Sequence, residues 1–179
     1  MQAIEFSPQK KVVYTHEQAL EALQHYCAYQ DRCHKEAREK LHELGYYGDP
    51  AEEVIAALIT EKYLDEERFA RNYARGKFKM KRWGKYKIRA ELKKREISAY
   101  CIKKAMTEID DAEYYTTMCD ELRRRDEAEK AGQHPYQKRR ALAEYMFKRG
   151  YESGLVWEAI NELGSDRQNP TQIHLFPRQ

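Results

Sequence analysis

The sequence predicts an all-helical protein built from tandem helical units, stacked end to end into an elongated and curved body. Helix-forming residues dominate the 179 positions, whereas only 8 Gly and 5 Pro are present. No segment alternates apolar and polar residues for long enough to predict a strand. Similar helix ends recur at Gly45, Glu96 and Gly150, at intervals of 51 and 54 residues. A period near fifty is typical of repeated units of about three helices.

The first expected helices have recognisable starts. Thr15-His16-Glu17-Gln18 is a capping box, in which the Thr and Gln side chains can each bind the other's backbone N–H. Apolar residues at helical spacing follow it, from Ala19 to Cys27. Another helix is expected at Asp49-Pro50, with Asp49 as the N-cap and Pro50 as the first helical residue.

The recurring helix ends share one pattern. An apolar residue lies four positions before each end, and a large apolar residue directly follows it. Gly45 and Gly150 suit the left-handed backbone that often ends a helix. Glu96 occupies the same position, where a residue with a side chain costs roughly 1 kcal/mol, so we expect a strained end there. Further helical segments should follow Asp65, Ser98 and Ser153.

Positive charge is concentrated in residues 71–104, the basic segment. These 34 positions hold 14 Lys or Arg and only two acids, Glu91 and Glu96, a net charge of +12. The whole chain carries +3, so the remaining residues carry −9. Because the two acids offer few i,i+4 partners, the segment favours a binding surface for phosphates or for an acidic protein groove. The alternative is a solvated helix face, which is what a charge run usually is.

Apolar and aromatic residues lie between these cations. Ile88 and Leu92 are four apart and would form the buried stripe of one helix. Phe78, Trp83 and Tyr86 favour core contacts around the turn between two helices, although an exposed platform that stacks on unpaired bases is the alternative.

Two stretches in the middle of the chain resemble one protein family. Tyr63-Leu64-Asp65-Glu66-Glu67-Arg68-Phe69-Ala70 resembles the "YLDDxRFA" signature of the RecX family, and residues 83–97 are similar to its "KGxxRIxxELxxKGI". The two stand in the family's order and separation, and the repeats extend the resemblance over roughly residues 17–163. Trp83 departs from the family's usual Lys or Arg, and Glu96 departs from its Gly.

The resemblance implies three tandem three-helix repeats at residues 15–63, 64–110 and 111–163, of which the second is the basic one. An N-terminal extension, 1–14, and a loosely ordered tail, 164–179, would flank them. It also implies a cytoplasmic regulator, without cofactor or catalytic activity, that binds RecA filaments on single-stranded DNA. Such a regulator would restrain strand exchange and ATP hydrolysis in DNA repair and the SOS response, and we expect a monomer.

The candidate contacts with the filament or its DNA are twelve cations of the basic segment. They are Arg71, Arg75, Lys77, Lys79, Lys81, Arg82, Lys85, Lys87, Arg89, Lys93, Lys94 and Arg95. The structural residues of the signature are Leu64, Asp65, Phe69, Gly84, Ile88 and Leu92. Among these, Asp65 should cap a helix and its acidic neighbours should favour the helix dipole, whereas Leu64 and Phe69 should be apolar anchors.

A second function class is a sequence-specific DNA-binding regulator, because three-helix units resemble helix-turn-helix domains. A recognition helix should offer Asn, Gln, Ser or Arg at successive base-facing positions. The segment Ser98–Thr107 offers Tyr100, Lys103 and Lys104 but no Asn or Gln. This composition favours backbone or protein contact over base reading. A structural scaffold that binds an acidic protein stays open.

The sequence contains no recognisable motif for catalysis or for metal binding. No phosphate loop, nucleophile elbow or HExxH pattern is present. The cluster of His25, Cys27, Cys33 and His34 lacks the paired spacing of a zinc site, so we expect reduced, unpaired thiols and no metal. The longest apolar run, residues 54–59, is too short to cross a membrane, and no secretory leader is recognisable.

The C-terminal third of the chain contains a second basic patch and an apolar stretch in its tail. A second basic patch, in residues 123–125 and 138–140, is interrupted by the acids of residues 126–129, so its charges should largely offset one another. In the tail, three apolar residues, Ile173, Leu175 and Phe176, could dock on another part of the protein.

Overall fold

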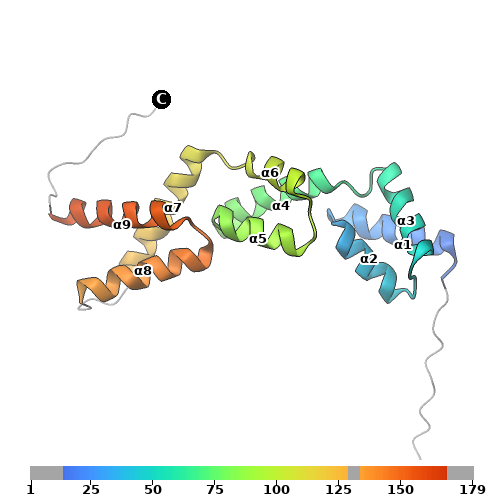
Figure 1. The fold of residues 1–179 in the computed structure, drawn as a ribbon, viewed down its shortest axis with the longest axis horizontal. Helices are drawn as coiled ribbons and strands as arrows, with labels where there is room; N and C mark the ends of the chain where they lie inside the picture. Colours follow the sequence, from blue (N-terminus) through green and yellow to red (C-terminus); the bar gives the residue numbers. More distant parts are fainter. Residues whose placement is uncertain (1–13, 129–133, 169–179) are drawn as a thin grey trace, which may run out of the picture. The chain divides into compact units, whose positions relative to one another are not determined.

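The computed structural model describes residues 14–128 and 134–168, and every regular element in these ranges is a helix (Figure 1). The elements are α1 (His16–Tyr29), α2 (His34–Glu43), α3 (Asp49–Thr60), α4 (Glu66–Lys81), α5 (Lys85–Lys94), α6 (Ala99–Met106), α7 (Asp111–Ala128), α8 (Pro135–Arg149) and α9 (Ser153–Gln168). The all-helical prediction is confirmed. The helices follow one another as three triplets, which agrees with three-helix repeats, while the repeat bounds and the elongated, curved arrangement stay predictions.

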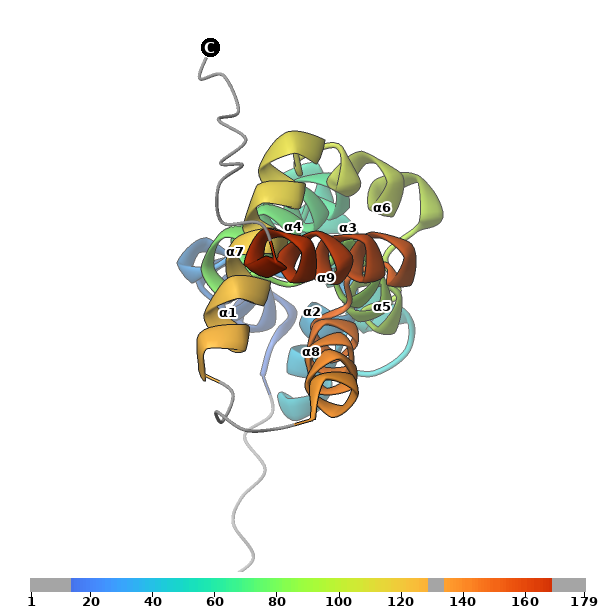
Figure 2. The ribbon, with the colours of Figure 1, turned by 90° about the vertical axis from the view of Figure 1, so that its left-hand side faces the viewer.

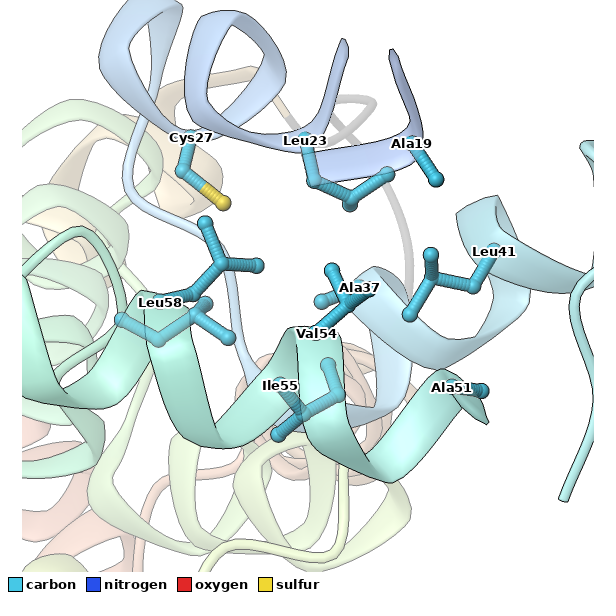
Figure 3. Packing of buried hydrophobic residues seen from close by; sticks show 10 residues of the cluster. Ala19, Leu23, Cys27, Ala37, Leu41, Ala51, Val54, Ile55 and Leu58 are labelled. Atoms are coloured by element: carbon cyan, nitrogen blue, oxygen red, sulfur yellow. The ribbon is translucent and has the colours of Figure 1, made fainter. Parts of the chain in front are cut away.

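The chain forms two compact units, Met1–Phe69 and Ala70–Gln179. In the first unit, α1, α2 and α3 pack around one apolar core (Figure 3). Leu23, Leu41 and Leu58, one from each helix, are fully buried there. The capping box of α1 forms as expected: the Gln18 N–H donates to the Thr15 hydroxyl at 3.3 Å, and the Thr15 N–H donates to Gln18 Oε1 at 3.0 Å.

Two other helix starts were predicted one residue too late. The N-cap of α3 is Gly48, with a left-handed φ of 63°, and Asp49 is the first helical residue. The Gly48 carbonyl accepts the first helical N–H groups, so no side-chain cap from Asp49 is needed. Likewise Ser153 is already helical, because the carbonyl of Glu152 accepts the Val156 N–H. Ser98 does cap α6, by accepting the Cys101 N–H.

The recurring helix ends are confirmed and have a common geometry. The backbone is left-handed at Gly45, Gly150 and Glu96, with φ of 86°, 87° and 61°. After each, the N–H of the large apolar residue closes the helix by binding the carbonyl five positions earlier. Two further left-handed residues, Lys62 at φ 64° and Arg82 at φ 50°, were not expected. Lys and Arg, unlike Gly or Asn, are not residue types that predict a positive φ.

The family-like signature at the start of α4 is structural. The Asp65 carboxylate caps α4 by accepting the Arg68 N–H at 2.8 Å. The Arg68 guanidinium donates to the carbonyls of Lys62 and Tyr63 and to the Asp31 carboxylate, so it satisfies backbone groups freed where α3 ends. Leu64 is buried in the core of the first unit.

The second unit holds the rest of the chain. Helices α7, α8 and α9 contact one another (Figure 2). Ile88 and Leu92 of α5 are fully buried, as expected. The Phe78 and Tyr114 ring centroids lie 5.9 Å apart, and Tyr114 lies 5.3 Å from the Tyr151 ring. Phe78 is thus a core residue, and this aromatic cluster joins α4 and α7 to the end of α8.

The predicted loose tail begins too early. Helix α9 continues to Gln168, so residues 164–168 are helical, while residues 169–179 and 1–13 lie outside the described residues. None of the four cysteines, all of them in the described ranges, forms a disulfide, and Cys27, Cys33 and Cys101 are buried. Within the described parts of the chain, no three His, Cys, Asp or Glu side chains converge on a metal-sized site. No described helix is long and apolar enough to span a membrane.

Candidate functional site

The start of the basic helix α5 is fixed against the end of α8. The Gly84 N–H donates to the Arg149 carbonyl at 2.8 Å, and the Tyr86 N–H donates to the Gly150 carbonyl at 3.0 Å. A Cβ atom on Gly84 would overlap the Gly150 carbonyl, although the backbone of Gly84, with φ of −72°, would accept any residue. Position 84 therefore has to be Gly because its backbone lies against the backbone of Gly150. This contact positions α5.

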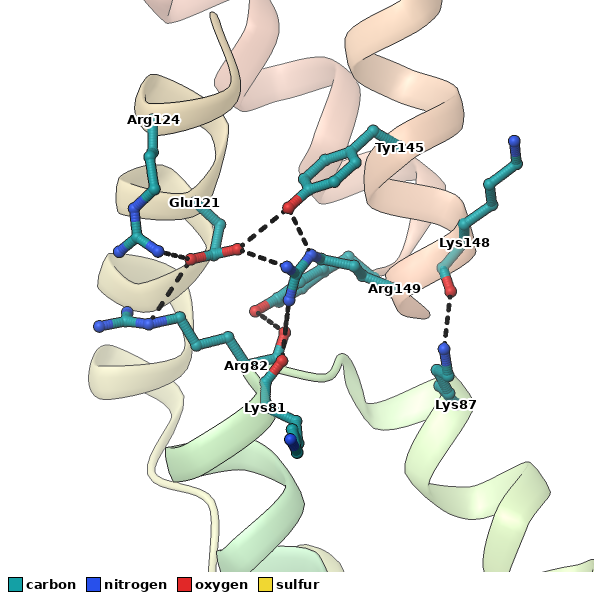
Figure 4. Close-up of polar contacts among 9 residues, drawn as sticks. Lys81, Arg82, Lys87, Glu121, Arg124, Tyr145, Lys148 and Arg149 are labelled. Atoms are coloured by element: carbon teal, nitrogen blue, oxygen red, sulfur yellow. Dashed lines mark hydrogen bonds and ion pairs between the residues drawn. The ribbon is translucent and has the colours of Figure 1, made fainter. Parts of the chain in front are cut away.

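A buried carboxylate holds the turn before α5 (Figure 4). Glu121 of α7 is 1% exposed and lies 2.9 Å from Arg124, 3.2 Å from Arg149 and 3.5 Å from Arg82. Its Oε1 has no aligned hydrogen bond, so Arg82 and Arg124 act on it through charge. A buried carboxylate is tolerated only when its charge is compensated in this way.

The same cluster explains the left-handed Arg82. Its carbonyl accepts a hydrogen bond from the Tyr151 hydroxyl at 3.1 Å, and the neighbouring Lys81 carbonyl accepts from the Arg149 guanidinium at 2.8 Å. The contacts with Glu121 and these carbonyl contacts together hold a backbone conformation that a side chain disfavours. Arg82 is thus a structural residue.

Several candidate cations bind acids that lie between α6 and α7 or at the start of α7. Arg71 and Arg75 of α4 both bind Glu108, at 2.5 and 2.6 Å, and these hydrogen bonds, first from Arg75 and then from Arg71, hold the pKa of Glu108 below its usual value. Lys85 binds Asp111 at 2.5 Å and lowers the pKa of that carboxyl. The acids that pair with these three cations here, at positions 108 and 111, lie outside the basic segment.

Lys85 also lies deeper than expected. Its side chain is only 15% exposed, its ammonium lies 4.7 Å from the centre of the Tyr114 ring, and its backbone N–H donates to the Tyr114 hydroxyl. Lys85 therefore contributes to the packing of the second unit rather than to an exposed cationic surface. Its removal would uncover the aromatic cluster.

Trp83 is flanked by cations. The ammonium groups of Lys87 and Lys77 lie 4.5 and 5.3 Å from the Trp83 ring, which is half-buried. Lys87 also donates to the Lys148 carbonyl at 3.3 Å. Trp83 thus makes cation–π contacts with α4 and α5, and Lys87 in turn links α5 to the end of α8.

Near the C-terminal end of α5, the cations form ion pairs with an acid of the same helix. Glu91 binds Lys94 at 2.8 Å and Arg95 at 3.0 Å, and hydrogen bonds from Lys94 and then Arg95 lower the pKa of Glu91. On α4, Lys79 has a longer contact of 4.0 Å with Glu113. These pairs are formed by exposed or half-exposed side chains and contribute little to stability.

One side of α5 keeps unpaired charge. Tyr86, Arg89 and Lys93 are three and four residues apart and lie on the same side of the helix, which we call the α5 ridge. All three are exposed, with Tyr86 at 56%. No ion pair joins Arg89 or Lys93 to any residue that the structure describes, and the same holds for exposed Lys81. The twelve candidates thus reduce to three exposed cations without an acidic partner in those ranges.

Helix α6 occupies the place of a recognition helix. Its exposed residues include Tyr100, at 62%, and Lys103, while the Lys104 ammonium lies 5.6 Å from the Tyr100 ring. No Asn or Gln lies between Ala99 and Met106. The helix offers charge and one aromatic ring, but no bidentate hydrogen-bonding side chain for adenine.

The second basic patch is offset by acids, as expected. Four of its cations form ion pairs: Arg123 with Asp120, Arg124 with Glu121, Lys138 with Asp126 and Arg140 with Glu144. Glu121 and Asp126 are the two buried acids among the described residues. This patch supports the fold of the third triplet.

Comparisons with known proteins agree on one family. A family model described as RecX, second three-helix domain, matches residues 65–106, which contain α4 to α6 and the α5 ridge. The regulatory protein RecX of Prosthecochloris aestuarii is 27% identical over 138 residues, which cover 77% of this chain and 88% of the relative.

Two crystal structures share the fold. RecX from Lactobacillus salivarius superposes with a TM-score of 0.69 at 21% identity, and the match covers 84% of this chain and 97% of that one. A second regulatory protein RecX gives a TM-score of 0.75 at 19% identity and covers 82% of this chain and 73% of its own.

Proposed function

Because this chain belongs to the RecX family, we propose that it binds RecA filaments on single-stranded DNA and restrains strand exchange and ATP hydrolysis by RecA. The observation that carries the proposal is the α5 ridge. It presents two exposed cations without an acidic partner in the described residues, and it lies in the segment that the family model matches. We propose a regulator rather than an enzyme, acting as a monomer in the cytoplasm in DNA repair and the SOS response.

The ridge has the chemistry to meet a polyanion. The Arg89 guanidinium can bind a phosphate or a carboxylate through two parallel hydrogen bonds, and Lys93 adds a point charge one helical turn away. Tyr86 offers a ring on which an unpaired base or a side chain of the filament can stack. The three side chains would therefore follow a strand or an acidic groove along the axis of α5.

The anchoring of α5 suggests how binding restrains RecA. Gly84 and the Glu121 cluster fix α5 to α7 and α8, so the ridge is presented by a rigid body. A rigid module bound to successive RecA subunits would oppose their relative movement during ATP turnover. The effect requires only that the module binds one filament state better than the other.

The alternative is a helix-turn-helix-like regulator that reads DNA sequence. The composition of α6 argues against it, because no residue from Ala99 to Met106 supplies an amide side chain. A DNA-reading regulator would bind one duplex sequence far more tightly than others in the absence of RecA.

The proposal is tested by adding the protein to RecA filaments on single-stranded DNA while ATP hydrolysis is followed. The wild-type chain should lower the rate, and R89A/K93A should require a higher concentration for the same effect. R89K/K93R, which keeps both charges, should act more like wild type than R89A/K93A does. K40A/R123A removes one half-buried and one exposed cation outside the ridge and serves as the control. Unchanged ATP hydrolysis at saturating wild-type protein would contradict the proposal.

A further inference from the structure

A groove of about 550 Å³ lies along α8 and ends at α9. Its aromatic residues are Tyr136 at one end and Phe147 with Trp157 at the other, where the two rings meet edge to face at 6.4 Å. Tyr136 is 68% exposed and Trp157 is 40% exposed. The groove is therefore an exposed apolar surface in a part of the protein that the α5 ridge does not use.

The cations beside this groove are already engaged. Arg140 forms an ion pair with Glu144 at 2.9 Å, and Arg139 donates a hydrogen bond to the Asn161 side chain. A nucleic-acid strand would find few free cations here. The chemistry of the groove suits an apolar peptide instead.

The arrangement of the two helices brings the end of α9 to the open end of the groove. Phe147 at the end of α8 contacts Trp157 at the start of α9, whereas Arg139 near the start of α8 lies beside Asn161 and Gly164. Helices α8 and α9 are thus antiparallel, which Figure 1 also shows. The chain leaves α9 after Gln168, on the side of Tyr136.

We propose that residues 173–176 of this chain occupy the groove. This segment, Ile173-His174-Leu175-Phe176, holds three apolar residues within four positions. The groove from Tyr136 to Phe147 is about 16 Å long at a helical rise of 1.5 Å per residue. An extended chain of about 3.3 Å per residue spans roughly 17 Å from Gln168 to Ile173, and a further ~10 Å to Phe176. The segment can therefore turn back and lie along α8.

Docking would cover the Phe147 and Trp157 rings, which line the far end of the groove from Tyr136.

The test uses the full chain labelled with 5-fluorotryptophan, which gives one ¹⁹F resonance each for Trp83 and Trp157. W157F identifies the Trp157 resonance. I173D/L175D/F176D removes the apolar side chains of the segment. T171D/Q172D/Q179D adds the same number of negative charges to the tail, keeps those side chains, and serves as the control.

The expected result is a shift of the Trp157 resonance in I173D/L175D/F176D alone, with the Trp83 resonance unchanged in every variant. The difference should not depend on protein concentration, because the contact lies within one chain. An unchanged Trp157 resonance in the first variant would overturn the proposal. So would an equal shift in the control, or a shift that grows with concentration, which would assign the groove to a second copy.

Discussion

Replacing Gly84 with Ala should weaken the attachment of α5 to α8 without straining the local backbone. Gly84 has φ of −72° and ψ of 159°, which Ala adopts freely, but its Cβ would overlap the Gly150 carbonyl and the Tyr151 backbone nitrogen. Overpacking against a rigid neighbour costs about 1–3 kcal/mol. The shift would also break the hydrogen bonds from Gly84 and Tyr86 to the end of α8, each worth about 1 kcal/mol. The free energy of unfolding should therefore fall by about 3–5 kcal/mol.

The assay is urea unfolding followed by circular dichroism, with G76A as the matched control. Gly76 lies inside α4, and a Cβ there would meet nothing within 4 Å. Because Ala is the better helix former, G76A should raise the free energy of unfolding by about 0.5–1 kcal/mol. If G84A unfolds at the same urea concentration as wild type, the two backbones are not in contact and α5 is not anchored on the end of α8.

Three further substitutions test other contacts by unfolding. E108Q removes the charged partner of Arg71 and Arg75 and should cost about 1 kcal/mol at neutral pH. Because the folded pKa of Glu108 is lowered, that stability is present above about pH 4.3 and is lost as the pH falls, so E108Q should show the smaller loss in acid. An equal acid loss in both proteins would contradict the pairing. Leu92 is fully buried, so L92A should cost about 2–5 kcal/mol, whereas exposed R89A should change stability by less than about 0.5 kcal/mol. If L92A and R89A lowered the free energy of unfolding equally, Leu92 would not be on the buried side of α5 and Arg89 on the exposed side.

The local elements were readable from the sequence because their causes are local. The Thr15 capping box, the Asp65 cap and the left-handed ends at Gly45 and Gly150 each depend on residues within about five positions. Even the strained end at Glu96 followed from its place in the repeat. The errors at α3 and α9 amount to one residue, since backbone carbonyls replaced the expected side-chain caps.

The site was predicted only in outline because its electrostatics are nonlocal. Glu108 lies 33 to 37 positions from the arginines that it binds, and Asp111 lies 26 from Lys85. No spacing rule within a helix finds such partners. The burial of Glu121 and the contact of Gly84 with Gly150 likewise depend on how α7 and α8 pack against α4 and α5. The sequence therefore located the basic segment, but only the fold separates its structural cations from those on the α5 ridge.

The most direct test of the α5 ridge is the salt dependence of binding to RecA filaments on single-stranded DNA, measured for the wild-type chain and for R89A/K93A. The ridge predicts weaker binding by the variant at low salt. It also predicts a plot of log affinity against log salt that is shallower by about 0.7 for each phosphate of the single strand that the variant no longer neutralises. Equal affinity and equal slope at every salt concentration would contradict the account and leave the α5 ridge as a solvated helix face.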